Sequence, residues 1–288
     1  MMKWSDFSVG LLFGTFIAFQ LALYAFAFYP PFTSLVDLTL IAYLKDVLGP
    51  VVTGFGGAGL GALAAYKFQQ KNEAAKEVKE NLNVLRLVKI QLVSKLSELV
   101  SIKKASILQH ADDKVRFIHI GPLPESAAIK ERVDSRILNV LADVGAGEAI
   151  QEILLGDQRY FACFENFKER NKALYEYRNK VNSAGLAGGI ECSFGEIARN
   201  VEPGRILALY ICTENLLLVL DESIQGIATA LDLVGGALDD TFSGTGARIM
   251  KFSKAESSAY EKLPEPKYTL DQLEAYLEHV FYSQQREA

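Results

Sequence analysis

Residues 50–71 read PVVTGFGGAGLGALAAYKFQQK, an uncharged, glycine-rich apolar segment that passes into a lysine-bearing helical pattern without a helix breaker. A helix rises about 1.5 Å per residue, and about 17 residues is the lower limit for crossing a bilayer core. Residues 50–66 meet that limit. We interpret them as a short membrane span that continues into a long connecting helix over residues 67–110.

Small residues recur at steps of three and four along one face of this predicted span. They are Gly54, Gly57, Ala58, Gly61, Ala62 and Ala65. Small side chains let two helix backbones approach closely, which is how spans associate in lipid. The sequence therefore predicts a packing or pore-lining face at Gly54, Gly57, Gly61 and Ala65, with the partner helix either in the same chain or in a second subunit.

A second uncharged segment, residues 9–29, lies nearer the N-terminus and is long enough to cross a hydrocarbon core of about 30 Å. Its one strongly polar side chain is Gln20, which would seek a hydrogen-bonding partner on another helix and joins the predicted packing or pore residues. A merely tolerated glutamine is the alternative. For the whole segment the alternative is a cleavable signal peptide, because Ala25-Phe26-Ala27 looks like a cleavage site.

The charges beside the two predicted spans indicate their orientation. The loop of residues 30–49 holds Lys45 as its one basic residue, whereas the second span is followed by Lys67, Lys71, Lys76, Lys79 and Arg86. Basic residues stay on the cytoplasmic side. We therefore expect a hairpin with both termini and the C-terminal domain in the cytoplasm. The expected organisation is a transmembrane region (1–66), the connecting helix (67–110) and a cytosolic helical domain (111–288).

The connecting helix carries an apolar seam. Apolar residues alternate steps of four and three, with Lys89 in one slot, at Val78, Leu82, Leu85, Leu92, Leu96 and Leu99. This is a coiled-coil-like pattern with a polar interruption. A neighbouring apolar row makes the face too wide for a two-stranded coil. A helix packed on both sides, in a bundle or against its own C-terminal domain, fits better.

Residues 111–288 predict an all-α bundle. We expect residues 115–123 to be extended and helices to cover residues 126–144, 148–155, 157–183 and 203–233. Asp157 is expected to cap the third of these helices, while Ser193 and Thr269 begin capping sequences of their own. The apolar run of residues 206–220 contains Glu214. It is therefore predicted to be a buried core helix, not a third span, and Glu214 should have an arginine partner.

A row of polar side chains shares one face of the helix predicted over residues 157–183. It comprises Arg159, Asn166, Arg170 and Tyr177, and Arg178 lies close by. Arginine guanidinium groups bind anionic ligands well. Arg159, Arg170 and Arg178 are therefore our candidates for contact with a signal. A solvated or ion-paired helix face is the alternative interpretation of the same pattern.

Composition and motifs argue against several functions. The net charge is −5, which does not favour a general nucleic-acid surface. With three cysteines, three histidines and no CxxC, HExxH or GxSxG motif, the sequence predicts no catalytic residue, no metal site and no cofactor. We therefore expect a non-enzymatic protein in a reducing compartment.

The layout of two spans (9–29 and 50–66), a long helix and an all-helical cytosolic domain resembles the small membrane effectors of bacterial abortive-infection (anti-phage) systems. That resemblance implies a homo-oligomer in the bacterial inner membrane. It would permeabilise the bilayer as a regulated pore or ion channel when a cytosolic sensor protein or a nucleotide or oligonucleotide signal binds. The alternative is a membrane-tethered interaction or scaffold protein without conductance.

Overall fold

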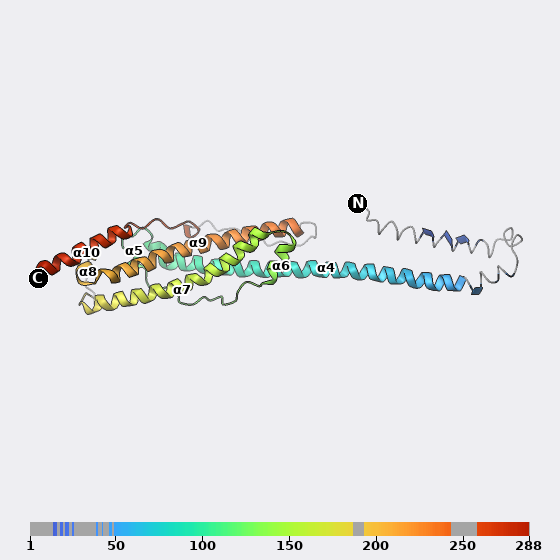
Figure 1. Ribbon diagram of the computed structural model, residues 1–288, viewed down its shortest axis with the longest axis horizontal. Coiled ribbons are helices and arrows are strands. Elements are labelled where there is room, and N and C mark those ends of the chain that lie inside the picture. Colours follow the sequence, from blue (N-terminus) through green and yellow to red (C-terminus); the bar gives the residue numbers. More distant parts are fainter. Residues whose placement is uncertain are drawn as a thin grey trace. The chain divides into compact units, whose positions relative to one another are not determined.

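The computed structural model describes residues 49–186, 193–242 and 258–287, together with isolated positions between residues 14 and 47. Within this part of the chain the fold is all-α and has no strand, as predicted (Figure 1). The helices are α4 (Gly49–Ile102), α5 (Arg116–His119), α6 (Arg136–Asp143), α7 (Gly147–Ser183), α8 (Phe194–Asn200), α9 (Pro203–Phe242) and α10 (Leu270–Glu287). The chain divides into two compact units, residues 1–78 and 79–288.

Helix α4 is one uninterrupted helix that starts in the glycine-rich segment and belongs to both units. It continues as a π-helical turn, Lys103–Ile107, and a 3₁₀ turn, Leu108–His110. The predicted seam is buried over most of its length, at Leu82, Leu85, Leu92, Leu96 and Leu99. Lys89, which interrupts the seam, is buried as well. The seam therefore packs inside the chain's own helical domain.

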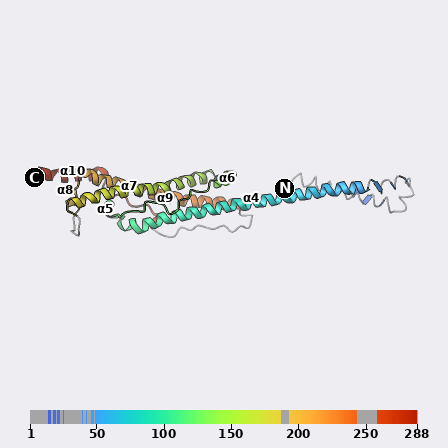
Figure 2. The ribbon, with the colours of Figure 1, turned by 90° about the horizontal axis from the view of Figure 1, so that it is seen from below.

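The main core of residues 79–288 joins the C-terminal half of α4 to α7 and α9, which lie side by side (Figures 1 and 2). Three aromatic side chains of α7, Tyr160, Phe164 and Phe167, are buried in this core. Gly156 permits close approach of the two helices, because a Cβ atom there would lie 3.2 Å from Cγ1 of Ile227.

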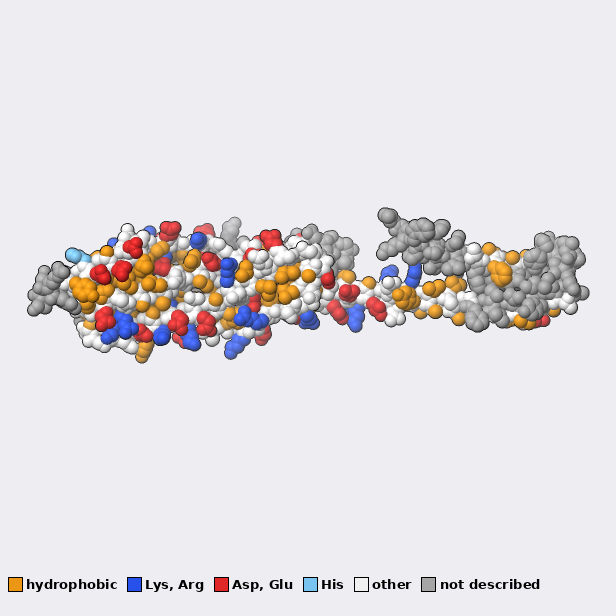
Figure 3. All heavy atoms as spheres, in the orientation of Figure 1, with side chains coloured by type: hydrophobic (Ala, Val, Ile, Leu, Met, Phe, Trp, Pro, Cys, Tyr) orange, Lys and Arg blue, Asp and Glu red, His pale blue; other side chains and the backbone are white. Residues whose placement is uncertain are grey.

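A smaller apolar cluster joins the start of α9 to α5, α8, α10 and the end of α7. Its buried residues include Phe117, Leu174, Tyr177, Leu209, Leu273 and Leu277. The two predicted helix caps are formed at the starts of α8 and α10, which belong to this cluster. Ser193 forms a full capping box with Glu196, and Thr269 exchanges hydrogen bonds with Gln272. On the face shown in Figure 3, acidic and basic side chains are interspersed over the helical domain, which is typical of a solvated surface.

Buried ion pairs connect the helices of this domain. Lys95 of α4 pairs with Asp157 of α7, and Lys103 pairs with Asp221 of α9 at 2.6 Å. The predicted arginine partner of Glu214 is Arg116, whose Nε and Nη2 atoms donate to the carboxylate at 3.0 and 2.5 Å. Charges buried in this way are stable only when paired, so each pair restricts how its two elements can be aligned.

Two predictions for residues 111–144 were wrong. The first part of the stretch 115–123 is not extended, since residues 116–119 form α5 with Arg116 and Phe117 buried, and the backbone becomes extended at Ile120. The helix predicted over residues 126–144 is limited to α6. Residues before it are held by distant side chains instead, because Glu98 accepts a hydrogen bond from the Ala128 amide. These tertiary contacts outweigh the local helical pattern.

The prediction of two helices within residues 148–183 was also wrong. One helix, α7, begins at Gly147 and continues through Asp157. Asp157 is not a helix cap. Its carboxylate accepts hydrogen bonds from Lys95 and from Arg132, the latter at 3.1 Å. The break before α7 was predicted correctly and occurs at Gly145, which has a positive φ of 73°.

One helix of the described residues, over Pro203–Asp239, is long and apolar enough to cross a membrane, and 39% of its most apolar window is buried. The two predicted N-terminal membrane spans do not meet this criterion of length and apolarity within the described residues. Residues 9–29 lie largely outside the described part, and residues 50–66 form the glycine-rich start of α4. In α9 the buried Thr213, Asp221 and Ser223 are polar groups within a packed core, as the sequence predicts for this helix.

The contact at Gly156 can be tested by substitution. Gly156→Leu would drive a side chain into Ile227 and should lower the free energy of unfolding by about 1–3 kcal/mol, because overpacking a core forces its helices apart. Gly236→Leu is the matched control, since no described atom lies within 4 Å of a Cβ there. Urea unfolding of the purified full-length chain in detergent measures both. Equal stability of the two variants would contradict this packing.

Candidate functional site

The predicted packing face of α4 is not covered within the described residues. Apart from the helix's own neighbouring backbone, no described atom lies within 4 Å of the Cβ position at Gly54, Gly57 or Gly61, and the same holds for Gly59 on the opposite face. Ala65 is exposed. Helical geometry places the four predicted packing residues of α4 on one face. Gln20, the other predicted packing residue, lies outside the described residues. The described part of the chain therefore presents a bare, small-residue face.

The three candidate arginines do not form one site. Arg170 is completely buried. Its guanidinium donates to the backbone oxygens of residues 117, 120 and 121, at 3.1, 2.5 and 2.6 Å. Its Nε atom donates to Thr213 Oγ1 at 3.3 Å. Arg170 thus holds α5 and the segment after it against α7 and α9, and its donors are not available to a ligand.

Burial lowers the pKa of Arg170 to about 10, and the nearby charge of Arg178 acts in the same direction. The guanidinium nevertheless stays protonated at neutral pH. A buried charge is tolerated when carbonyl dipoles surround it with hydrogen bonds. Arg170 is therefore a structural cation that organises an otherwise irregular segment.

Arg159 and Arg178 lie on the surface of α7. Arg159 is partly exposed, and its Nη2 atom lies 3.9 Å from Oε2 of Glu222 on α9. This loose ion pair matches the alternative interpretation of an ion-paired helix face. Arg178, in contrast, is exposed and borders a surface groove. Of the three candidates, it is the one that the structure places at a cavity.

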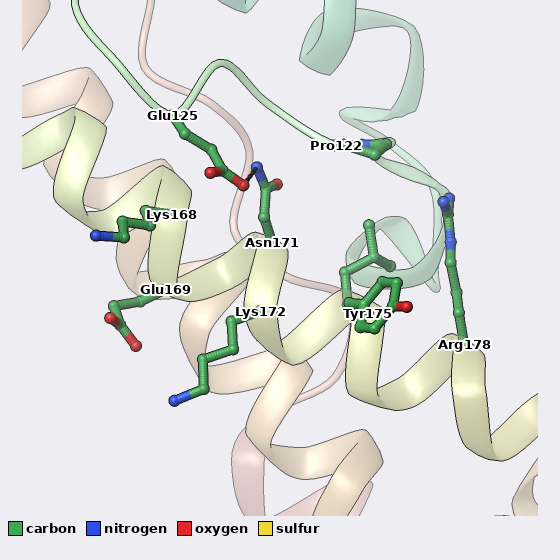
Figure 4. Close-up of a pocket in the computed structure, with 9 residues that line it drawn as sticks. Pro122, Glu125, Lys168, Glu169, Asn171, Lys172, Tyr175 and Arg178 are labelled. Carbon is green, nitrogen blue, oxygen red and sulfur yellow. Dashed lines mark hydrogen bonds between the residues drawn. The ribbon is translucent and has the colours of Figure 1, made fainter.

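The groove has a volume of about 420 Å³ and lies between α7 and the segment of residues 122–125 (Figure 4). Asn171 anchors this segment to α7. It accepts a hydrogen bond from the Leu123 amide at 2.9 Å and donates to the Leu123 carbonyl at 2.7 Å. Its amide also donates to Oε1 of Glu125 at 3.2 Å. One wall of the groove is therefore fixed by side-chain hydrogen bonds.

The lining of the groove carries both charge and an aromatic ring. It comprises Pro122, Glu125, Lys168, Glu169, Asn171, Lys172, Leu174, Tyr175 and Arg178. It includes three cationic and two anionic side chains, and Tyr175 is 69% exposed. Cations bind phosphate or carboxylate groups, and an exposed ring can stack on a planar group. This combination suits recognition of a small planar anion.

Arg178 is the groove residue that was predicted from the sequence, and the other lining residues were not predicted. Lys168, Lys172 and Tyr175 follow one another at steps of four and three, so they share a helix face with Asn171. That spacing could have identified these residues from the sequence. The position of residues 122–125 on the other side of the groove could not be predicted, because it depends on hydrogen bonds from Asn171 and Arg170. The described residues lining the groove include no histidine, cysteine or serine.

Comparisons with protein-family models, with curated proteins and with solved structures found no match to this chain. The structure offers two features that bear on function, the small-residue face of α4 and the groove on α7.

The role of Arg170 predicts a large stability effect. Arg170→Met preserves much of the side-chain volume but leaves three backbone oxygens without their donors, so the free energy of unfolding should fall by about 3 kcal/mol or more. Arg178→Met removes an exposed arginine from the same helix and should change it by less than about 0.5 kcal/mol. Urea titration followed by circular dichroism compares them. A wild-type midpoint for Arg170→Met would show that the buried cation is dispensable.

Proposed function

We propose that this chain is a homo-oligomeric effector of the bacterial inner membrane that forms a regulated, ion-conducting pore. In this proposal the N-terminal segments span the bilayer as a hairpin, both termini are cytoplasmic, and the helical domain receives a signal. The biological setting that we propose is defence against phage, as in the membrane effectors that the layout resembles. The proposal assigns no enzymatic activity to this chain.

The observation that supports it best is the continuity of α4. The helix begins in the apolar glycine-rich segment and ends among the buried residues of the helical domain, with Leu85, Leu92 and Leu99 in the core. A continuous helix resists bending except at proline, Gly/Ser pairs or local π turns, and residues 67–102, which join the glycine-rich segment to the domain, contain no glycine or proline. A rotation or shift of α4 in the domain is therefore expected to reach residues 50–66, provided that two packing states exist.

The small-residue face supplies the contact between subunits. Gly54, Gly57 and Gly61 lie on one face and carry no side chain beyond hydrogen, so a second copy of the same face can approach closely. In lipid this close packing is the main attraction between spans. Residues 50–66 have no charged side chain, and the proposed pore would therefore close by excluding water at an apolar constriction.

The groove on α7 is our candidate for the signal site. Its cations and the exposed Tyr175 suit a small nucleotide, which carries phosphate groups and a planar base. Arg178 is the member of this site that the sequence also predicts. Binding there would bias α7, whose packing against α9 and α4 forms the main core.

A membrane-tethered scaffold is the second candidate function. It is favoured by the same absence of charge in residues 50–66, because many conducting pores carry rings of charged side chains. In that case α4 is an anchor and stalk, and the groove serves an interaction partner. The two candidates differ in whether the membrane potential falls when the protein is expressed.

The proposed pore predicts a face-specific effect on membrane potential. Bacteria that express the native chain should depolarise once the signal is present, and Gly57→Leu with Gly61→Leu should abolish this because bulky side chains block close helix approach. Gly59→Leu is the matched control. It lies on the opposite face of the same turn and should retain depolarisation. A potential-sensitive dye measures all three, with membrane levels of each variant equalised.

The outcomes separate the two candidates. Depolarisation by the native chain and by Gly59→Leu, but not by the double variant, supports a pore built on the small-residue face. Depolarisation by all three contradicts that face. If none depolarises the cell under phage challenge, the protein acts as a tether without conductance.

A further inference from the structure

Three potential metal ligands meet at the turn between the end of α4 and α5. They are His110, Asp113 and His119, and one ligand atom from each lies within 4.8 Å of the other two. The chain has three histidines in all, so two of them gather at this turn. No metal site was predicted from the sequence, because the spacing of these residues matches no common metal motif.

Backbone geometry brings the first two ligands together. After α4 the helix changes to a π turn and then to a 3₁₀ turn that ends at His110. The amide of Asp113 donates to the His110 carbonyl at 3.0 Å, and Oδ1 of Asp113 accepts from the Val115 amide at 2.9 Å. His110 and Asp113 are therefore held as neighbours by main-chain hydrogen bonds and not by chance contact of mobile side chains.

His119 reaches the same point from the end of α5. Its Nδ1 atom contacts Oδ2 of Asp113, and its ring centre lies 6.1 Å from that of His110. Helix α5 is itself fixed by Arg116, which pairs with Glu214 and donates to the carbonyls of Ala111 and Pro264 at 3.1 and 2.8 Å. A buried arginine thus holds both sides of the cluster in place.

The cluster is open to solvent. The side chains of His119 and Asp113 are 50% and 29% exposed. Solvent can therefore reach the cluster, and an ion could enter and leave without unfolding the domain.

We propose that His110, Asp113 and His119 form a binding site for a divalent transition metal, with Zn²⁺ as the ion that fits best. Two imidazole nitrogens and one carboxylate oxygen are a common protein ligand set for zinc, with water in the fourth position. Zinc bonds of about 2.0–2.2 Å require ligand atoms to lie roughly 3–3.5 Å apart. Closing the present cluster to that size needs a shift of about 1 Å, which the partly exposed imidazole rings can provide by side-chain rotation.

Zinc at this position would join the last turn after α4 to α5. Because α5 contacts α9 and Arg116 reaches Pro264, the ion would stiffen the connection between the long helix and the rest of the domain. The zinc site is independent of the proposed pore. A metal-free ion pair between Asp113 and His119 is the competing explanation of the same geometry.

The test uses the full-length chain in detergent, purified with an affinity tag that contains no histidine. Isothermal titration with Zn²⁺ should show saturable binding of one ion per chain, and Co²⁺ should give the visible absorption of a tetrahedral nitrogen and oxygen site. His119→Ala and Asp113→Asn should each weaken binding by at least about tenfold, as loss of even a supporting group does in known sites. His279→Ala, on the exposed face of α10, is the control and should bind normally.

Two results would overturn the proposal. One is no saturable uptake of Zn²⁺ by the native chain. The other is unchanged affinity in both His119→Ala and Asp113→Asn. The second variant guards against misfolding, because asparagine retains the oxygen that accepts from the Val115 amide. Circular dichroism spectra matching the native chain qualify each variant for comparison.

Discussion

Burial of the apolar face of α4 against α7 and α9 is the constraint on which the helical domain depends. Apolar contact alone would allow the helices to slide along one another, since leucines repeat along the seam. Buried ion pairs remove that freedom. Lys95 pairs with Asp157 on α7 and Lys103 with Asp221 on α9, so a shift of either neighbour along α4 would leave a buried charge without its partner.

The elements that follow from short-range periodicity were predictable from the sequence. The uninterrupted α4, the core position of α9 and the caps at Ser193 and Thr269 all have local signals. Residues 115–134 did not, because their path depends on Arg170 and Asn171, which lie far along the chain and bind the segment's backbone. The local conformational preferences of a sequence do not reflect contacts between residues that lie far apart in the chain.

The same contrast between local patterns and long-range contacts applies to the candidate sites. A helical step pattern identifies which residues share a face, and so it places Gly54, Gly57 and Gly61 together and groups the arginines of α7. It does not say which face is buried, and Arg170 proved to be internal whereas Arg178 borders the groove. The cluster of His110, Asp113 and His119 was invisible in the sequence, because a turn and a short helix create it.

The most direct test of the account asks whether residues 50–66 lie in a bilayer while the same helix continues into the cytoplasm. Single cysteines are placed along α4, in a chain whose native cysteines are serines, and inside-out membrane vesicles are treated with a membrane-impermeant maleimide. The account predicts protection at Ala58, Ala62 and Ala65 and labelling from Lys71 to Lys79. Labelling of all these positions alike would contradict a membrane span in α4.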